Sequence, residues 1–296
     1  MRRVEVRPPF ADLRSASNAR LVWRRFRQSP LAIFGLGVFV VLFVCAVAGP
    51  ILPLADPYDQ DITREVERPS LDRLMGSDPY GRDVLSRIVV ATRHALLIGF
   101  ASAGIAALIG APLGLVAGFY GRFWDTAIMR LADTLLTFPV ILLALVMIGS
   151  LGSSTSSVLV AFGVVFAPRY VRLVRASVLS LKSTEFVHAA VALGASDARV
   201  LALHILPNAL SPVLVQFTAN FAYAIVAETS LSFLGLGVQP PEPSWGSMLS
   251  EARPYIGSES WLALFPGLVL VIAVLGLNLL GDGLRDALDP RLRVRK

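Results

Sequence analysis

Long apolar runs, separated by short polar segments, dominate the chain. A helix needs about 20 apolar residues to cross the ~30 Å hydrocarbon core of a bilayer. About six runs are long enough, and they cover residues 31–50, 95–119, 131–151, 155–174, 209–229 and 261–281. The pattern predicts an all-α fold, a polytopic membrane helical bundle of about six transmembrane helices.

The first run needs a check, because an arginine-rich segment precedes it, as in a cleaved signal peptide. The residues Ala46–Ala48 also resemble a signal-peptidase site. The run is longer than the 7–15 apolar residues of a typical signal peptide, and its basic lead-in is longer too. We therefore expect a retained membrane anchor rather than a cleaved signal.

These boundaries predict a simple organisation along the chain. Its parts are an Arg-rich cytosolic arm (1–30), a first transmembrane helix (31–50), an extracytoplasmic segment (51–94), a five-helix core (95–284) with a cytosolic loop (176–207), and a basic cytosolic tail (285–296).

Composition supports a membrane protein. The 296 residues are 55% hydrophobic and 16% charged, and the mean hydropathy is +0.66, which does not suit a water-soluble domain. The net charge of +6 comes from basic residues beside apolar runs without interleaved aromatics, so we expect no nucleic-acid partner. Because basic residues concentrate in both terminal segments, both termini are expected in the cytoplasm. Arg82, Arg87 and Arg93 are exceptions to this charge rule.

Two features predict how the helices pack. Ala106, Gly110, Gly114 and Gly118 recur every four residues in the second run. Such a small-residue stripe lets another helix approach closely in lipid. Pro139 lacks an N–H and clashes with the preceding turn, so a kink is expected within the third run.

No residue pattern indicates an enzyme. The sequence has no phosphate-binding loop, no metalloprotease or serine-hydrolase motif, and a single cysteine, Cys45. The three histidines are far apart in the sequence, so no metal site is expected. Glu228 is an acid in an apolar run, and such acids often line pathways. Counting from Ala209, it falls near the outer mouth, where gate packing and substrate contact both remain open.

The segment "EFVHAAVALGASDARVLALHILPN" (residues 185–208) interrupts two of the most apolar runs. Its apolar and small side chains recur on one helical face, and Gly194 suits a left-handed C-cap. Ser196 or Asp197 can begin a second short helix, which Pro207 would end before the fifth run starts. A short cytosolic helix of this kind predicts docking into a groove of a partner protein.

This segment resembles the EAA loop of permease subunits of ATP-binding-cassette importers. Four further stretches, "MGSDPYGRDVLSR", "PRYVRLVRASVLSLK", "HILPN" and "ETSLSFLGLGVQPPEPSWGSML", are similar to the second permease subunit of the dipeptide, oligopeptide and nickel family. The first alanine after the glutamate of the EAA loop is displaced here by Phe186-Val187-His188. The Arg-rich arm has no counterpart in the motif.

The resemblance implies a half-transporter of the prokaryotic plasma (inner) membrane. It would pair with a second permease subunit, two ATP-binding-cassette ATPase subunits and an extracytoplasmic solute-binding protein. The ATPases would bind ATP and Mg, and this chain would bind no cofactor. The residues implied in coupling to the ATPase are Glu185, Ala189, Ala190, Gly194, Leu206 and Pro207.

The implied solute is a di- or oligopeptide, with nickel or glutathione as alternatives. A stand-alone secondary transporter would be expected to show an inverted repeat and midplane ionisable groups. A membrane-embedded enzyme would need clustered acids or histidines, and the candidates are scattered. Both remain remote alternatives.

Two outer loops are expected to meet the binding protein and close the pathway. One loop contributes Asp78, Gly81, Arg82 and Asp83. The other contributes Pro240, Pro241 and Trp245, and Glu228, which precedes it in the sequence, is counted with the same outer gate. The alternative is that these loops only hold the outer ends of the helices, with Trp245 as an interfacial anchor.

Overall fold

The computed structural model describes residues 18–288, and within them the chain folds into helices joined by loops. The main helices are α1 (Asn18–Phe26), α2 (Pro30–Ala48), α3 (Val84–Tyr120), α4 (Arg122–Thr137), α5 (Val140–Leu151), α6 (Thr155–Lys182), α7 (Glu185–Ala192), α8 (Asp197–Arg199), α9 (Leu206–Phe233), α10 (Trp245–Ala252) and α11 (Trp261–Leu288). Short 3-10 helices cover Gly49–Ile51, Ile62–Arg64 and Arg253–Tyr255. The arm up to residue 17 and the tail from residue 289 lie outside the described residues.

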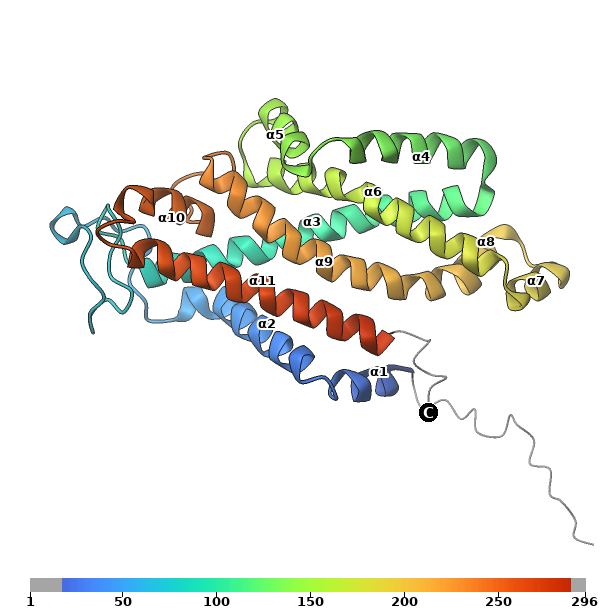
Figure 1. The fold of residues 1–296 in the computed structure, drawn as a ribbon, viewed down its shortest axis with the longest axis horizontal. Coiled ribbons are helices and arrows are strands. Elements are labelled where there is room, and N and C mark those ends of the chain that lie inside the picture. The colour runs from blue at the N-terminus through green and yellow to red at the C-terminus, as the bar shows by residue number, and fades with distance from the viewer. Residues whose placement is uncertain (1–17, 289–296) are drawn as a thin grey trace, which may run out of the picture.

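The long helices run roughly along one axis and form an elongated bundle (Figure 1). Within residues 18–288, five helices are long and apolar enough to cross a membrane, or six if α4 and α5 count as one bent span. The loop before α3 and the short helix α10 lie at one end of the bundle. The helix α7 lies at the opposite end, where α1 and the end of α11 are also found. This arrangement confirms the predicted all-α membrane bundle.

The helix α3 begins at Val84 and runs for 37 residues, so it starts well before the predicted residue 95. Its N-cap is Asp83, whose side chain accepts a hydrogen bond from the backbone N–H of Ser86. A carboxylate at this position satisfies an unpaired N–H and complements the helix dipole. Hydropathy missed this first part because its polar residues are buried against the outer loops rather than against lipid.

The third apolar run is not one kinked helix. The helices α4 and α5 meet at an angle of 96°, and Pro139 is the residue that precedes α5. The helix α4 begins at Arg122, and two ion pairs join it to α6. Arg175 Nη2 lies 2.7 Å from Asp125 Oδ2, and Arg172 Nη2 lies 2.6 Å from Asp133 Oδ1. The predicted kink at Pro139 is therefore a full break between two helices.

The glycine stripe of α3 packs closely on another helix, as the sequence predicted, and that helix is α6. A Cβ atom on Gly114 would lie 2.7 Å from the carbonyl oxygen of Val171 and 2.8 Å from the Cβ of Val174. Gly110 and Gly118 meet α6 one turn away on either side in the same manner. The three glycines let the two backbones approach more closely than any side chain would permit.

We expect Gly114→Val to force α3 and α6 apart. Overpacking of a close interface costs typically 1–3 kcal/mol and more when backbone atoms block relaxation. The matched control is Gly104→Val in the same helix, because a Cβ there meets nothing within 4 Å. Thermal unfolding of the purified chain in detergent should show a lower midpoint for Gly114→Val than for Gly104→Val. Equal midpoints would contradict the role of the stripe.

The sequence predicted that Pro207 ends a second short cytosolic helix, and this is wrong. Asp197–Phe233 forms one continuous helical span. Val200–Ile205 forms a π-helical turn within it, in which the N–H of Leu206 donates to the carbonyl of Leu201. Pro207 has no N–H to donate, so it fits at the start of α9 immediately after this wider turn.

Candidate coupling and outer-face sites

The helix α7 covers the first eight residues of the predicted docking segment, from Glu185 to Ala192. Val187 is 3% exposed and packs against Phe119, Val178 and Ile205 at the ends of three longer helices. This contact holds the short helix on the end of the bundle, since so short a helix is not stable by itself.

The other face of α7 is open to solvent. Glu185 and Ala189 are exposed, and the apolar side chain of Leu193 is 89% exposed. Among the described side chains, no cation forms an ion pair with Glu185. Ala190 differs from the prediction, because it is buried against this chain's own bundle. Ala190 therefore permits close packing of α7 on its own chain, and Ala189 remains the candidate for contact with a partner.

Gly194 ends α7 in the way the sequence predicted. Its φ angle is +83°, which is the left-handed conformation that glycine adopts without a steric penalty. The N–H of Gly194 donates to the carbonyl of Val191 at 2.9 Å, and the N–H of Ala195 donates to the carbonyl of Ala190 at 3.0 Å. These two bonds form a Schellman cap. The cap turns the chain toward α8 and α9, and Leu206 and Pro207 are the first two residues of α9.

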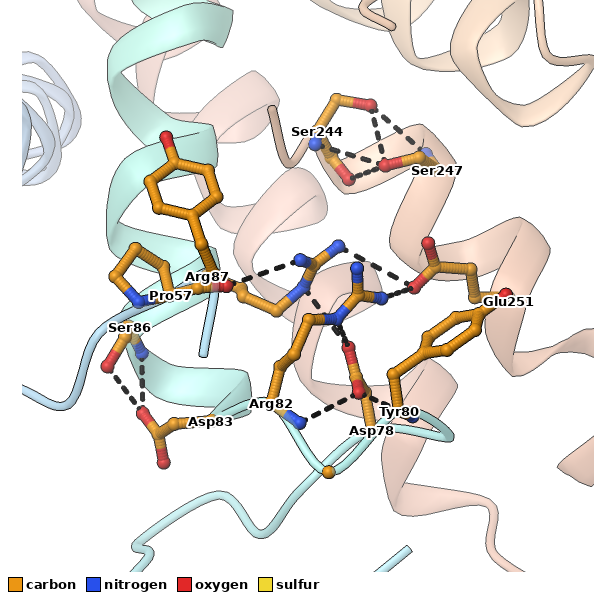
Figure 2. A network of polar contacts seen from close by, with 12 residues as sticks. Pro57, Asp78, Tyr80, Arg82, Asp83, Ser86, Arg87, Ser244, Ser247 and Glu251 are labelled. Atoms are coloured by element: carbon orange, nitrogen blue, oxygen red, sulfur yellow. Dashed lines mark hydrogen bonds and ion pairs between the residues drawn. The ribbon is translucent and has the colours of Figure 1, made fainter. Parts of the chain in front are cut away.

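At the opposite end of the bundle, two arginines and two acids form a buried ion-pair network (Figure 2). Arg82 Nε lies 2.6 Å from Asp78 Oδ2, and Arg82 Nη2 lies 2.8 Å from Glu251 Oε2. Arg87 reaches the same two acids at 3.3 and 3.6 Å. Glu251 belongs to α10, so the network joins the loop before α3 to the segment after α9.

The backbone of the outer loop supports this network. Asp78 Oδ1 accepts hydrogen bonds from the N–H groups of Tyr80 and Arg82 at 2.9 and 3.0 Å. The Arg82 guanidinium also lies 4.4 Å from the centre of the Tyr80 ring. Gly81 has a φ angle of +73° between these residues. The loop is therefore held by the same side chains that form the ion pairs.

Comparison with known proteins identifies the family of the chain. Residues 110–294 match the family described as "Binding-protein-dependent transport system inner membrane component". Residues 17–69 match the "N-terminal TM domain of oligopeptide transport permease C". This chain belongs to the binding-protein-dependent permease family. It is a permease subunit of an ATP-binding-cassette importer, a family that works with ATPase and permease partners and a binding protein.

Individual relatives align with almost the whole permease. This chain is 41% identical over 286 residues to the dipeptide transport system permease protein DppC of Alkalihalophilus pseudofirmus, and the alignment covers 97% of this chain and 94% of the relative. It is 42% identical over 288 residues to the glutathione transport system permease protein GsiD of Pectobacterium atrosepticum, with 97% and 95% covered.

A solved structure supports the fold. The MetNI methionine ABC transporter in an inward-facing conformation is 22% identical and aligns with a TM-score of 0.58. The alignment covers 69% of this chain and 97% of that chain.

The structure contradicts part of the expected docking surface of the permease. Arg82 is 8% exposed, and Asp78, Gly81 and Asp83 are buried as well. Trp245 is 1% exposed and starts α10 inside the core, so it is not an interfacial anchor. These residues hold the outer ends of the helices together. Pro240 and Pro241 are exposed, and their contact with a binding protein remains a prediction.

Glu228 of the permease lies near the C-terminal end of α9, on the side of α10, and is 1% exposed. The hydroxyl of Ser232 donates to Glu228 Oε1 at 2.5 Å and accepts from the N–H of Val238 at 3.0 Å. The acid thus fixes the turn that follows α9. This geometry favours the packing role over direct contact with a solute.

A pocket that is mainly apolar but contains a group of polar side chains was not predicted from the sequence. The pocket has a volume of about 550 Å³, and its lining includes Tyr58, Arg93, His94 and Glu242. The Tyr58 hydroxyl donates to Glu242 Oε2 at 2.8 Å, and His94 Nε2 lies 3.4 Å from the same oxygen. Burial and the hydrogen bond to Glu242 raise the pKa of Tyr58 to about 12. These residues come from three distant segments, which no local motif can connect.

Proposed function

We propose that this permease moves di- or oligopeptides across the membrane, with glutathione as a second candidate. The observation that carries this proposal is the similarity over nearly the full length to a dipeptide permease and a glutathione permease. An extracytoplasmic binding protein would deliver the solute to the end that contains α10.

The exposed face of α7 is proposed to dock into an ATPase subunit. Glu185 offers a carboxylate free of ion pairs among the described side chains, and Ala189 and Leu193 offer small and apolar contact. The partner ATPases would bind ATP and Mg and hydrolyse ATP, while this chain binds no cofactor. The complete importer would contain this chain, a second permease subunit and two ATPases.

Affinity capture of the chain from membranes tests the assembly. Two ATPase polypeptides and a second permease should co-purify with it, and their absence would favour a stand-alone transporter. Thermal unfolding of the purified binding protein tests the solute, because a ligand raises the midpoint of the protein that binds it. A dipeptide or glutathione should raise this midpoint. If nickel raises it and neither peptide does, the proposed solute is wrong.

The proposed orientation places α7 and both termini in the cytoplasm. In a Cys45-free background, we expect Gln60→Cys to react with a membrane-impermeant maleimide added outside intact cells. Ser196→Cys should react only after the cells are opened. Both positions are exposed on the chain, so accessibility depends on the side of the membrane. Labelling of Ser196→Cys in intact cells without labelling of Gln60→Cys would reverse the orientation.

A further inference from the structure

Arg169 lies near the middle of the bundle and contacts Asn220. Arg169 is at the midpoint of α6, a helix of 28 residues, and Asn220 is at the midpoint of α9, which also has 28 residues. Asn220 lies at the centre of the apolar run 209–229, and Arg169 contacts it from α6, so the pair is placed near the middle of the ~30 Å hydrocarbon layer. A charge at this depth is costly and almost always faces a polar partner or a water-filled path.

The contacts of Arg169 do not neutralise its positive charge. Arg169 Nη1 donates a hydrogen bond to Asn220 Oδ1 at 3.3 Å. The guanidinium lies 5.5 Å from the centre of the Phe166 ring and 4.9 Å from that of the Tyr223 ring. Among the side chains that the structure describes, no carboxylate forms an ion pair with Arg169. The aromatic rings can fix the orientation of the guanidinium, but they do not neutralise it.

The side-chain amide of Asn220 provides a second hydrogen-bond donor beside the Arg169 guanidinium. Its Oδ1 accepts from Arg169 and also from Gln216 Nε2 at 3.0 Å. Its Nδ2 is buried and faces the Tyr170 hydroxyl without a well-formed hydrogen bond, and the whole residue is 1% exposed. A buried amide N–H without a partner costs roughly 1–3 kcal/mol. A guanidinium without an ion pair and an amide N–H without a well-formed hydrogen bond therefore lie side by side, and a stronger acceptor would bind both.

An open cavity leads toward this pair. It has a volume of about 450 Å³, and its lining includes Gln216, Ser211, Asn208 and Arg285 from α9 and α11, together with Leu173 of α6. Gln216 belongs both to this lining and to the hydrogen-bonded chain that ends at Arg169. Polar groups thus continue from the α7 end of the bundle to its centre.

We propose that Arg169 and Asn220 bind the carboxylate of the transported solute as it passes the middle of the membrane. A carboxylate is acceptor-only and fits the fork of a guanidinium with two parallel hydrogen bonds. The amide N–H of Asn220 supplies a further donor to the same group. This inference rests on the proposed transport of peptides, which carry a terminal carboxylate, and it assigns the pathway residues that recognise it.

The test uses the complete importer in lipid vesicles, with trialanine and trialanine amide as probes at concentrations that saturate the binding protein. We expect Arg169→Gln to lower the maximal uptake of trialanine about ten- to hundredfold, the loss for a hydrogen bond to a charged group. Arg169→Lys should restore part of it, because the charge remains. Uptake of the amide should be almost unchanged. Arg172→Gln is the matched control, since Arg172 lies on the same helix as Arg169 and forms only an exposed ion pair with Asp133 of α4.

The outcomes separate this inference from the function on which it rests. No uptake of trialanine by the unmodified importer would contradict the proposed solute class. If the unmodified importer takes up trialanine and Arg169→Gln does so at the same rate, the carboxylate site is wrong. Loss of the second permease subunit from purified Arg169→Gln complexes would also overturn it, because Arg169 would then pair with an acid of that subunit.

Discussion

Gly194→Val and Glu185→Lys are each expected to abolish ATP-driven uptake while the chain still inserts and pairs with the second permease. Valine at a φ angle of +83° strains the Schellman cap and disfavours the turn by about 1–3 kcal/mol. Lysine at position 185 reverses an exposed charge in the first turn of α7. Both changes should misplace or repel the ATPase. Uptake into vesicles and co-purification of the second permease measure the two effects separately.

Gly152→Val is the matched control for the strained turn. Gly152 has a φ angle of +88°, and, as at Gly194, a Cβ atom added there would meet nothing within 4 Å. It lies between α5 and α6, away from α7 (Figure 1). This variant should carry the same backbone strain and retain uptake. If both glycine variants lose uptake equally, or if Gly194→Val and Glu185→Lys transport at the normal rate, α7 is not the coupling helix.

Arg82→Glu is expected to destabilise the permease strongly. The change removes a buried cation from Asp78 and Glu251 and adds a third acid beside them. Removing one partner of a buried ion pair costs about 3–5 kcal/mol, because the remaining charge is left without compensation. The thermal unfolding midpoint of the purified complex should fall clearly, and the yield of assembled complex should fall with it.

The control for this variant is Arg68→Glu in the same outer segment. Arg68 is 80% exposed in its pair with Glu259, and such a pair contributes about 1 kcal/mol or less. The complex with Arg68→Glu should have a thermal unfolding midpoint close to that of the unmodified complex. If Arg82→Glu is equally stable but loses stimulation of ATP hydrolysis by the loaded binding protein, Arg82 is a docking residue after all.

The apolar runs of the sequence predicted the spans well, because lipid demands a continuous apolar surface. The glycine stripe at Gly110, Gly114 and Gly118 predicted a close contact with another helix, since a local spacing of four residues encodes one helix face, and the structure shows that this helix is α6. Gly194 was recognisable for the same reason, as its conformation depends on its own backbone. In each case the residues that determine the feature are close to one another in the sequence.

Features that depend on distant segments could not be read from the sequence. Arg82 and Arg87 looked like exceptions to the positive-inside rule, and the structure explains them by pairing both with Asp78 and Glu251. Pro139 indicated a kink, but the 96° turn depends on how α4 packs against α6. Arg169 stood in a basic stretch, and its position in the bundle emerged only from its contact with Asn220.

The most direct measurement of the central claim is uptake of a radiolabelled dipeptide by vesicles that contain the reconstituted importer and its binding protein. The account predicts accumulation that requires both ATP and the binding protein, and that disappears when this chain carries Glu185→Lys. Accumulation without ATP, or a complete importer that hydrolyses ATP with the loaded binding protein but moves neither a dipeptide nor glutathione, would contradict it.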